Sequence, residues 1–236
     1  MKLEKNTKIT ILSLCIFLIV GVLIFVLIRG GAEEFFGNGN GDQSREILFL
    51  EDVHDVDGNI YKTVKIGDQV WMAENLKALH SFGESWCYNN QEHFCERYGR
   101  LYNWEAVMNG SVEPGVQGIC PDGWHVPTDA EWYILESFFA TGTCSSSRLD
   151  WGCSPAGALM KTETWSGQEE NAFAVLPAGF IDLQGKSSLL NSYSYFWTSS
   201  KLGSDVWRRG FLDSQSNILR NTVNPEFGYS VRCIKD

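Results

Sequence analysis

The chain has 236 residues, of which 44% are hydrophobic and 20% are charged, and its formal net charge is -10. This composition predicts a compact acidic domain and argues against nucleic-acid binding, which requires a basic surface. Most of the acidity lies beyond the N-terminal segment, since of the 19 basic and 29 acidic residues, 15 and 28 follow residue 29. Composition alone identifies no reaction.

The first segment with a clear pattern is apolar. From Ile9 to Ile28 the chain runs for 20 residues without a charge, and a helix of this length spans the roughly 30 Å core of a bilayer. A cleaved signal peptide is the alternative, but its apolar region is usually about 7–15 residues long. Three lysines precede the run and one arginine follows it, so residues 1–8 are expected in the cytoplasm. We therefore predict a single-pass transmembrane anchor over residues 9–28, with the folded domain outside the cytoplasm.

Residues 29–51 follow as a spacer that is rich in glycine and polar residues. Such a stretch buries too little apolar surface to fold, so it is predicted to be a flexible tether. The folded domain is then expected to start near Asp52 and to extend over residues 52–236.

Short strands are predicted in the folded part. Residues 61–66 alternate with period two, Gly67-Asp68 suit a turn, and residues 69–72 resume the strand pattern, which together indicate a hairpin. Further short strands, separated by turn residues, are predicted at residues 173–180, 195–199, 206–212, 218–223 and 229–234.

One helix is clearly indicated in the middle of the domain. Thr128 and Glu131 form a capping box, the usual start of a helix. Trp132, Leu135 and Phe139 then share one helical face, which predicts that this face is buried. With few helices and many short antiparallel strands, the fold class is predicted to be α+β.

Cysteine content agrees with an exported domain. Beyond Cys15, which lies in the predicted anchor, the chain has six cysteines. An even number in an exported domain indicates disulfides, and six cysteines allow 15 different pairings. A metal site would have to use Cys87, His93 and Cys95, with His80 nearby, and this spacing fits no closed zinc site of the CxxC type. Disulfides are therefore favoured, and no metal or cofactor is predicted.

Longer motifs point to a known family. The motifs are, in chain order, residues 55–59, 61–67, 71–76, 98–104, 120–132 (CPDGWHVPTDAEW), 176–179 (LPAG), 196–200 (FWTSS) and 228–233 (GYSVRC). Over residues 52–236 the chain resembles the Fibrobacter succinogenes major paralogous domain family. This resemblance implies a C-type-lectin-like fold, of the branch shared with formylglycine-generating enzymes, in bacterial surface proteins mostly without an assigned activity.

The resemblance also implies a disulfide pairing. Four of the six cysteines lie outside the motifs and look like two local bridges within loops. The two motif cysteines are left to form a long-range bridge that ties the entrance of the predicted helix to the last strand. The implied pairs are Cys87–Cys95, Cys144–Cys153 and Cys120–Cys233.

No enzyme is indicated by the sequence. Chemistry of the formylglycine-generating type would need a reactive cysteine pair near the C-terminus, where only Cys233 lies. Carboxylate pairs such as Asp205 and Asp213 could serve glycoside hydrolysis, but chance pairs are expected in so acidic a domain. His125 lies inside a family motif, and no nucleophile motif accompanies it.

Calcium-dependent sugar binding is also unsupported. Asp55-x-Asp57-Gly58-Asn59 begins like a calcium loop, but it lacks a third ligand at the right spacing and the terminal glutamate. A turn before the first predicted strand is therefore favoured. The Glu-Pro-Asn or Gln-Pro-Asp motif of sugar-binding C-type lectins is replaced here by Asn224-Pro225-Glu226.

The fold implied by the resemblance typically builds its ligand surface from C-terminal strands and loops. Here residues 192–226 are the richest in side chains suited to contacts, because aromatic and arginine side chains supply large contact areas. Arg208 and Arg209 are adjacent, so only one of them can face a ligand. An ordinary solvated strand edge is the alternative. The candidate ligand-binding residues are Tyr193, Tyr195, Trp197, Trp207, Arg208, Arg209, Asp213, Asn217, Arg220 and Asn221.

These observations together lead to a functional expectation. We expect a membrane-anchored, non-catalytic bacterial cell-surface domain that binds an extracellular glycan or protein in an adhesion-like role. One alternative is a structural protein of the cell envelope without a discrete ligand. A carbohydrate-active enzyme is the least favoured alternative.

Overall fold

The computed structural model describes residues 46–79, 82–165 and 172–236. The predicted cytoplasmic tail, the anchor over residues 9–28 and most of the tether lie outside these residues. In the described part of the chain, no helix is both long and apolar enough to cross a membrane.

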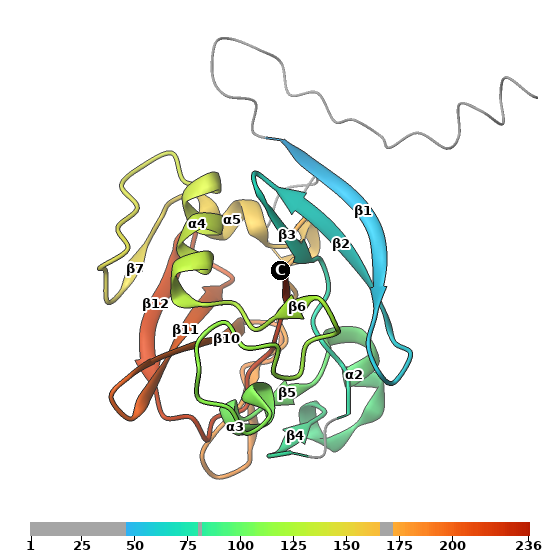
Figure 1. Ribbon diagram of the computed structural model, residues 1–236. Helices are drawn as coiled ribbons and strands as arrows, with labels where there is room; N and C mark the ends of the chain where they lie inside the picture. Colours follow the sequence, from blue (N-terminus) through green and yellow to red (C-terminus); the bar gives the residue numbers. More distant parts are fainter. Residues whose placement is uncertain (1–45, 80–81, 166–171) are drawn as a thin grey trace, which may run out of the picture. The chain divides into compact units, whose positions relative to one another are not determined.

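Two larger sheets organise the domain, and every pair of strands in them is antiparallel (Figure 1). The five-stranded sheet contains, in spatial order, β1 (Ile47–His54), β2 (Ile60–Ile66), β3 (Gln69–Met72), β13 (Ile234–Lys235) and β6 (Trp124–His125). The four-stranded sheet contains β10 (Tyr193–Leu202), β11 (Asp205–Leu212), β12 (Ile218–Val223) and β7 (Trp151–Gly152). Two small sheets pair β4 (Ser85–Trp86) with β5 (Leu101–Tyr102) and β8 (Phe180–Ile181) with β9 (Ser187–Ser188).

The helices of the described residues are few and short. They are α2 (Glu92–Tyr98), α3 (Trp104–Met108), α4 (Asp129–Phe139) and α5 (Ala156–Met160), with 3₁₀ turns at Tyr88–Asn90 and Glu163–Trp165. The predicted α+β class with short antiparallel strands is therefore confirmed.

The predicted hairpin and helix are both present. Strands β2 and β3 pair from Thr63 opposite Met72 to Ile66 opposite Gln69. At the start of α4 the capping box is complete, because the Glu131 carboxylate accepts from the Thr128 backbone N–H at 2.8 Å and the Thr128 hydroxyl accepts from the Glu131 N–H at 3.2 Å. The predicted apolar face of this helix is buried.

Helix α4 supplies the aromatic centre of a core that the two larger sheets share. The ring of Trp132 lies 5.1 Å from that of Trp71 on β3 and 5.5 Å from that of Phe196 on β10. Phe173 completes the group, 5.8 Å from Trp132. These rings bury large apolar areas and so fix the helix between strands that are far apart in sequence.

The predicted start of the folded domain was wrong by five residues. Residues 47–51, assigned to the tether, form the first part of β1, with Ile47 opposite Ile66 and Phe49 opposite Val64. The outer edge of β2 offers these residues backbone hydrogen bonds, and Ile47 packs against the core. The polar composition of the preceding residues gave no sign of this pairing.

Two predicted strands are only partly formed. Of residues 173–180 only Phe180 enters a strand, and of residues 229–234 only Ile234 does. The backbone of the latter segment bonds to a different neighbour at nearly every step: Tyr229 to Tyr102, Ser230 to Tyr195, and Val231 to Leu76. The segment is buried and extended, so it has the pattern of a strand without belonging to one ladder.

The three implied disulfides are confirmed. The pairs are Cys87–Cys95, Cys120–Cys233 and Cys144–Cys153, with Cα–Cα distances of 5.0, 5.8 and 4.3 Å. The second bridge spans 113 residues of sequence and joins the segment before β6 to the segment before β13. It therefore secures the last strand at its place between β3 and β6, where the chain end lies in Figure 1. By loop entropy, a bridge over so long a loop contributes about 4–5 kcal/mol.

Candidate functional site

The register of the four-stranded sheet divides the predicted ligand-binding residues between two faces. Arg208 lies opposite Trp197 on β10 and Asn221 on β12, so these three side chains share one face. Arg209 lies opposite Phe196 and Arg220, which therefore share the other face. The two adjacent arginines point in opposite directions, as the strand geometry predicted.

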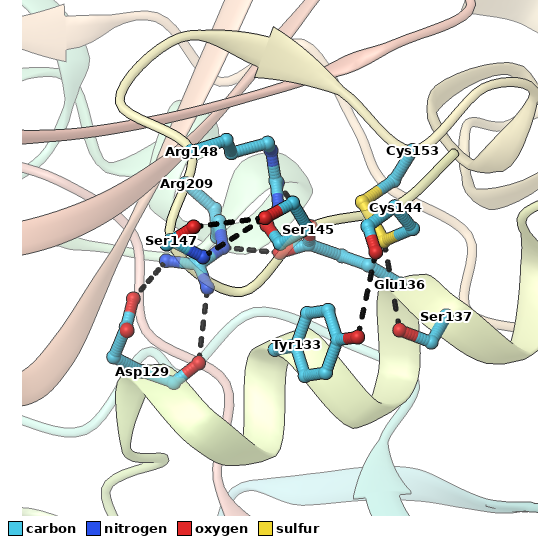
Figure 2. The surroundings of a disulfide bond; sticks show 10 residues. All are labelled: Asp129, Tyr133, Glu136, Ser137, Cys144, Ser145, Ser147, Arg148, Cys153 and Arg209. Atoms are coloured by element: carbon cyan, nitrogen blue, oxygen red, sulfur yellow. Dashed lines mark hydrogen bonds and ion pairs between the residues drawn. A yellow bond between two sulfur atoms is a disulfide. The ribbon is translucent and has the colours of Figure 1, made fainter.

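The face that carries Arg209 is covered by α4. The Arg209 side chain is 0% exposed, and it pairs with Asp129 at 2.7 Å and with Glu136, both on α4 (Figure 2). Arg220 pairs with the same Asp129 at 2.7 Å. Burial opposes the ionisation of Asp129, but the two guanidinium groups outweigh it and hold the pKa of this carboxyl below its usual value.

Glu136 is shared by a further arginine. Its carboxylate also pairs with Arg148, which lies in the loop bridged by Cys144–Cys153 (Figure 2). Helix α4 thus holds both the sheet and this loop through buried charges. We interpret the network as structural, because both of its carboxylates are paired with arginines of the protein itself.

Several predicted contact residues are therefore corrected. Arg209 and Arg220 are buried against α4, and Trp207 is 9% exposed with the Arg220 guanidinium 3.7 Å from its ring centre. None of the three therefore presents a surface to a ligand. The sequence did not show this, since alternation separates two faces without saying which one is covered.

Two other candidates lie at the end of the sheet. Asp213 and Asn217 belong to the connection between β11 and β12, with Asp213 exposed and Asn217 half-buried. Backbone carbonyls of this connection accept hydrogen bonds from the Lys161 ammonium group, which anchors it to the segment after α5. The structure does not place these two residues on either face described above.

The opposite face gathers the remaining candidates around Arg208. We call the set Tyr193, Tyr195, Arg208, Asn221 and Tyr229 the Arg208 face. The Arg208 guanidinium lies 4.1 Å from the ring centre of Tyr195 and 5.1 Å from that of Tyr229. Its Nε donates to Asn221 Oδ1 at 2.9 Å, and its Nη1 donates to the Tyr229 hydroxyl. The guanidinium is thus held in one orientation by two hydrogen bonds and two rings.

A glycine makes this arrangement possible. Gly210 lies opposite Tyr195, and a Cβ at position 210 would come within 2.8 Å of the Tyr195 ring. Without that atom the ring can lie across β11 beside Arg208. Burial raises the pKa of the Tyr195 hydroxyl, and Arg208 opposes this only in part, so the phenol stays neutral at physiological pH.

The accessible part of the Arg208 face is smaller than the predicted site. Tyr193, Arg208 and Asn221 are half-buried, and so can be reached from solvent, whereas Tyr195, Trp197 and Tyr229 are buried beneath them. Trp197 donates its indole N–H to the Tyr102 carbonyl at 2.7 Å, so it forms the floor. Arg208 Nη2 has no hydrogen-bond partner among the described residues, which leaves a charged donor free to bind an acceptor.

Sequence reasoning missed two aromatic members of this region. Tyr229 was assigned to a family motif and a predicted strand, and Phe227 was one residue beyond the proposed segment. Their rings are stacked with centres 5.6 Å apart, and Phe227 is half-buried. Only the passage of residues 228–230 beside β10 brings Tyr229 to Arg208 and, through Tyr229, places Phe227 in this region, so no local signal could have identified them.

Two clusters of metal-ligating residue types occur in the described residues, and neither offers thiolates. They are Cys87, Glu92 and Cys95, and Glu136, Cys144 and Cys153. In each cluster the two sulfur atoms are joined in a disulfide, which removes the thiolates that a metal would bind.

The aspartate-rich segment near the first hairpin forms a turn. Asp55 accepts hydrogen bonds from the backbone N–H groups of Asp57 and Asn59 and from the Tyr61 hydroxyl. Asp57 accepts from the Leu79 N–H at 2.7 Å. These carboxylates are used by protein donors, in agreement with the turn that the sequence favoured.

Comparison with known proteins identifies one family. The family model of the Fibrobacter succinogenes major domain matches residues 64–235. No curated protein and no solved structure matches the chain. The family match together with three disulfides suggests an extracellular surface domain.

Proposed function

The chain belongs to the Fibrobacter succinogenes major domain family, and from this premise we propose that it is a non-catalytic cell-surface domain that binds an extracellular glycan or protein through the Arg208 face. Residues 9–28 would anchor the domain in the membrane, and the fold would be of the C-type-lectin-like kind, whose C-terminal strands commonly carry the ligand surface. The role would be adhesion-like.

The observation that carries this proposal is that the Arg208 side chain is preorganised. Its guanidinium is oriented by Asn221 and Tyr229 and stacked on Tyr195, while its Nη2 remains available on an accessible face. A side chain that is fixed before binding loses little entropy when a ligand binds. Aromatic and arginine side chains that meet on one partly exposed surface are typical of residues that dominate binding energy.

The geometry of the single histidine in the family motif supports a non-catalytic role. His125 Nε2 lies 2.9 Å from Glu131 and its Nδ1 lies 2.8 Å from Asp236. Both ring nitrogens are therefore engaged by carboxylates, and the hydrogen bond to Glu131 above all raises the pKa of the imidazole. A histidine held in this way is poorly suited to accept a proton from a substrate.

The proposal can be tested by screening the full chain against arrayed glycans and extracellular proteins from bacterial cultures, and then by measuring the affinity of variants for the ligand found. Arg208→Ala and Tyr193→Ala should each weaken binding at least about tenfold, since each removes an accessible contact of the Arg208 face. Lys65→Ala is the matched control, because Lys65 is a half-buried cation on β2, outside the Arg208 face, that pairs with Glu46.

Unchanged affinity in both variants would place binding elsewhere and refute the role of the Arg208 face. A chain that binds no member of either panel would instead favour the structural role in the cell envelope. Turnover of a polysaccharide would overturn the non-catalytic assignment.

A further inference from the structure

A pocket of about 370 Å³ is lined by residues other than those of the Arg208 face. Its walls come from β2, the segment of residues 73–77 that follows β3, the C-terminal end of α2 and residues 172–176. This volume lies at the low end of the range for ligand pockets, about 300–1,000 Å³, so the pocket would hold a molecule of the size of one sugar residue.

The pocket lining has one more cation than carboxylates, in an otherwise acidic protein. Its lining includes Lys62, Lys77 and Arg97, against the carboxylates of Glu74 and Glu96. In the described part of the chain, no ion pair ties these three cations to a carboxylate. They are therefore available to an anion.

Two of these cations are positioned by tyrosine rings. The Lys77 ammonium lies 5.8 Å from the ring centre of Tyr61, and the Arg97 guanidinium lies 5.1 Å from that of Tyr98. Both tyrosines are buried and also line the pocket. The backbone N–H of Lys77 in addition donates to the Tyr61 hydroxyl at 3.0 Å, which ties the position of Lys77 to the pocket wall.

A fourth cation lies beneath the pocket floor. Arg232 is almost fully buried, and its guanidinium donates to Asn75 Oδ1 at 2.8 Å, to the Ala174 carbonyl at 2.9 Å and to the Phe173 carbonyl. All three acceptors are neutral, and burial lowers the pKa of Arg232 to about 9. The side chain of Asn75, which lines the pocket, is thus held by a buried cation that has no carboxylate bonded to it in the described residues.

From these observations we propose that the pocket binds a small hydroxylated carboxylate of the uronic-acid type, free or at the end of a polysaccharide. Lys62, Lys77 and Arg97 would bind the carboxylate group of this ligand. The carboxylates of Glu74 and Glu96 and the hydroxyl of Thr162, which also line the pocket, would accept hydrogen bonds from sugar hydroxyls. A pocket with both kinds of group fits a uronic acid better than a simple anion or a neutral sugar.

The test is to titrate the full chain with D-glucuronate, D-glucose and acetate in separate experiments. Isothermal titration calorimetry measures each affinity, and saturation-transfer NMR detects binding independently. Glucuronate should bind at least about tenfold more tightly than either of the other two. Lys77→Gln and Arg97→Gln should each weaken glucuronate binding about tenfold or more. Arg97 is exposed, so its replacement tests the pocket even if Lys77→Gln fails to fold.

Two control variants make the result specific. Lys65→Gln removes a cation outside the pocket, and Arg208→Ala removes the key residue of the proposed ligand face, so neither should change glucuronate binding. Equal binding of glucose and glucuronate, or no binding of glucuronate, would overturn the proposal. A loss of glucuronate binding in Arg208→Ala would assign it to the other face and refute the pocket as the site.

Discussion

The two faces of the β10–β11–β12 sheet use the same residue type for opposite purposes. On one face, Arg209 and Arg220 are buried under α4 and neutralised by Asp129 and Glu136. On the other, Arg208 is held by neutral partners, Asn221 and two tyrosines, and remains accessible. The partner therefore distinguishes the buried arginines from the accessible one: carboxylates satisfy the charge, whereas rings and an amide orient it without neutralising it.

The strongest test of this contrast replaces each adjacent arginine by alanine. Arg209→Ala should lower the free energy of unfolding by about 3–5 kcal/mol, because Glu136, 0% exposed, would lose a partner and leave a buried charge poorly compensated. Arg208→Ala should cost about 1 kcal/mol or less, since only a half-buried stack and its hydrogen bonds are lost. Urea denaturation of both variants measures the difference.

The contrast would be broken by equal losses of stability in the two variants. A near-neutral Arg209→Ala would mean that the network around α4 contributes little to stability. In that case the two faces of the β10–β11–β12 sheet would not differ in what their arginines contribute to stability.

A smaller effect is expected at the glycine that admits the Tyr195 ring. Gly210→Ala should destabilise the domain by about 1–3 kcal/mol, because the new Cβ would come within 2.8 Å of that ring and force it to move. The same change should reorient Arg208 and alter the near-ultraviolet circular dichroism of the tyrosines. Gly142→Ala is the control, since the nearest atom there would be 3.8 Å away.

An unperturbed near-ultraviolet spectrum in Gly210→Ala would show that Tyr195 does not depend on the space at Gly210. The Arg208 face would then be less tightly organised than its contacts suggest.

The smallest expected effect is a pH dependence at the start of α4, the helix that covers the Arg209 face. In the folded protein the pKa of His125 is raised, mainly by its hydrogen bond to Glu131. The stabilisation by the imidazolium is therefore fully present below the pKa of His125 in the unfolded chain, about 6.5. It is lost as the pH rises through the higher pKa of His125 in the folded protein. Unfolding free energies measured between about pH 6 and pH 9 should fall more steeply in the wild type than in His125→Gln.

Parallel curves for the two proteins would show that His125 does not stabilise this end of the helix. Because Asp236 is largely exposed, solvent screens its contribution, and most of the effect should come from Glu131.

Local sequence patterns were sufficient for much of the fold. The alternation in residues 61–66 and 69–72 identified β2 and β3, and the turn residues that separate residues 206–212 from 218–223 identified β11 and β12. The capping box at Thr128 identified α4. In each case neighbouring residues determine the result, because side chains alternate along a strand and the capping bonds join residues three apart.

The candidate site was predicted less well. The sequence located the C-terminal strands and established that Arg208 and Arg209 face opposite ways, but it could not separate Arg208 from Arg209 and Arg220. It also placed Trp207 among the contact residues, although this side chain is buried beside Arg220. Tyr229 was missed because it reaches Arg208 only through the path of residues 228–230 beside β10, and Phe227 was missed because it joins the region only by stacking on Tyr229.

By itself, the sequence determined the α+β class, the family and the alternation of side chains in the C-terminal strands. Only the tertiary structure decided which face of those strands α4 covers, and which cations therefore remain accessible. The reason is that covalent geometry sets the direction of each side chain relative to its neighbours, whereas burial depends on segments that are distant in sequence. Asp129 and Glu136 lie more than 70 residues from Arg209 along the chain. Their ion pairs with Arg209 bury that side chain, so that of the two adjacent arginines only Arg208 remains accessible.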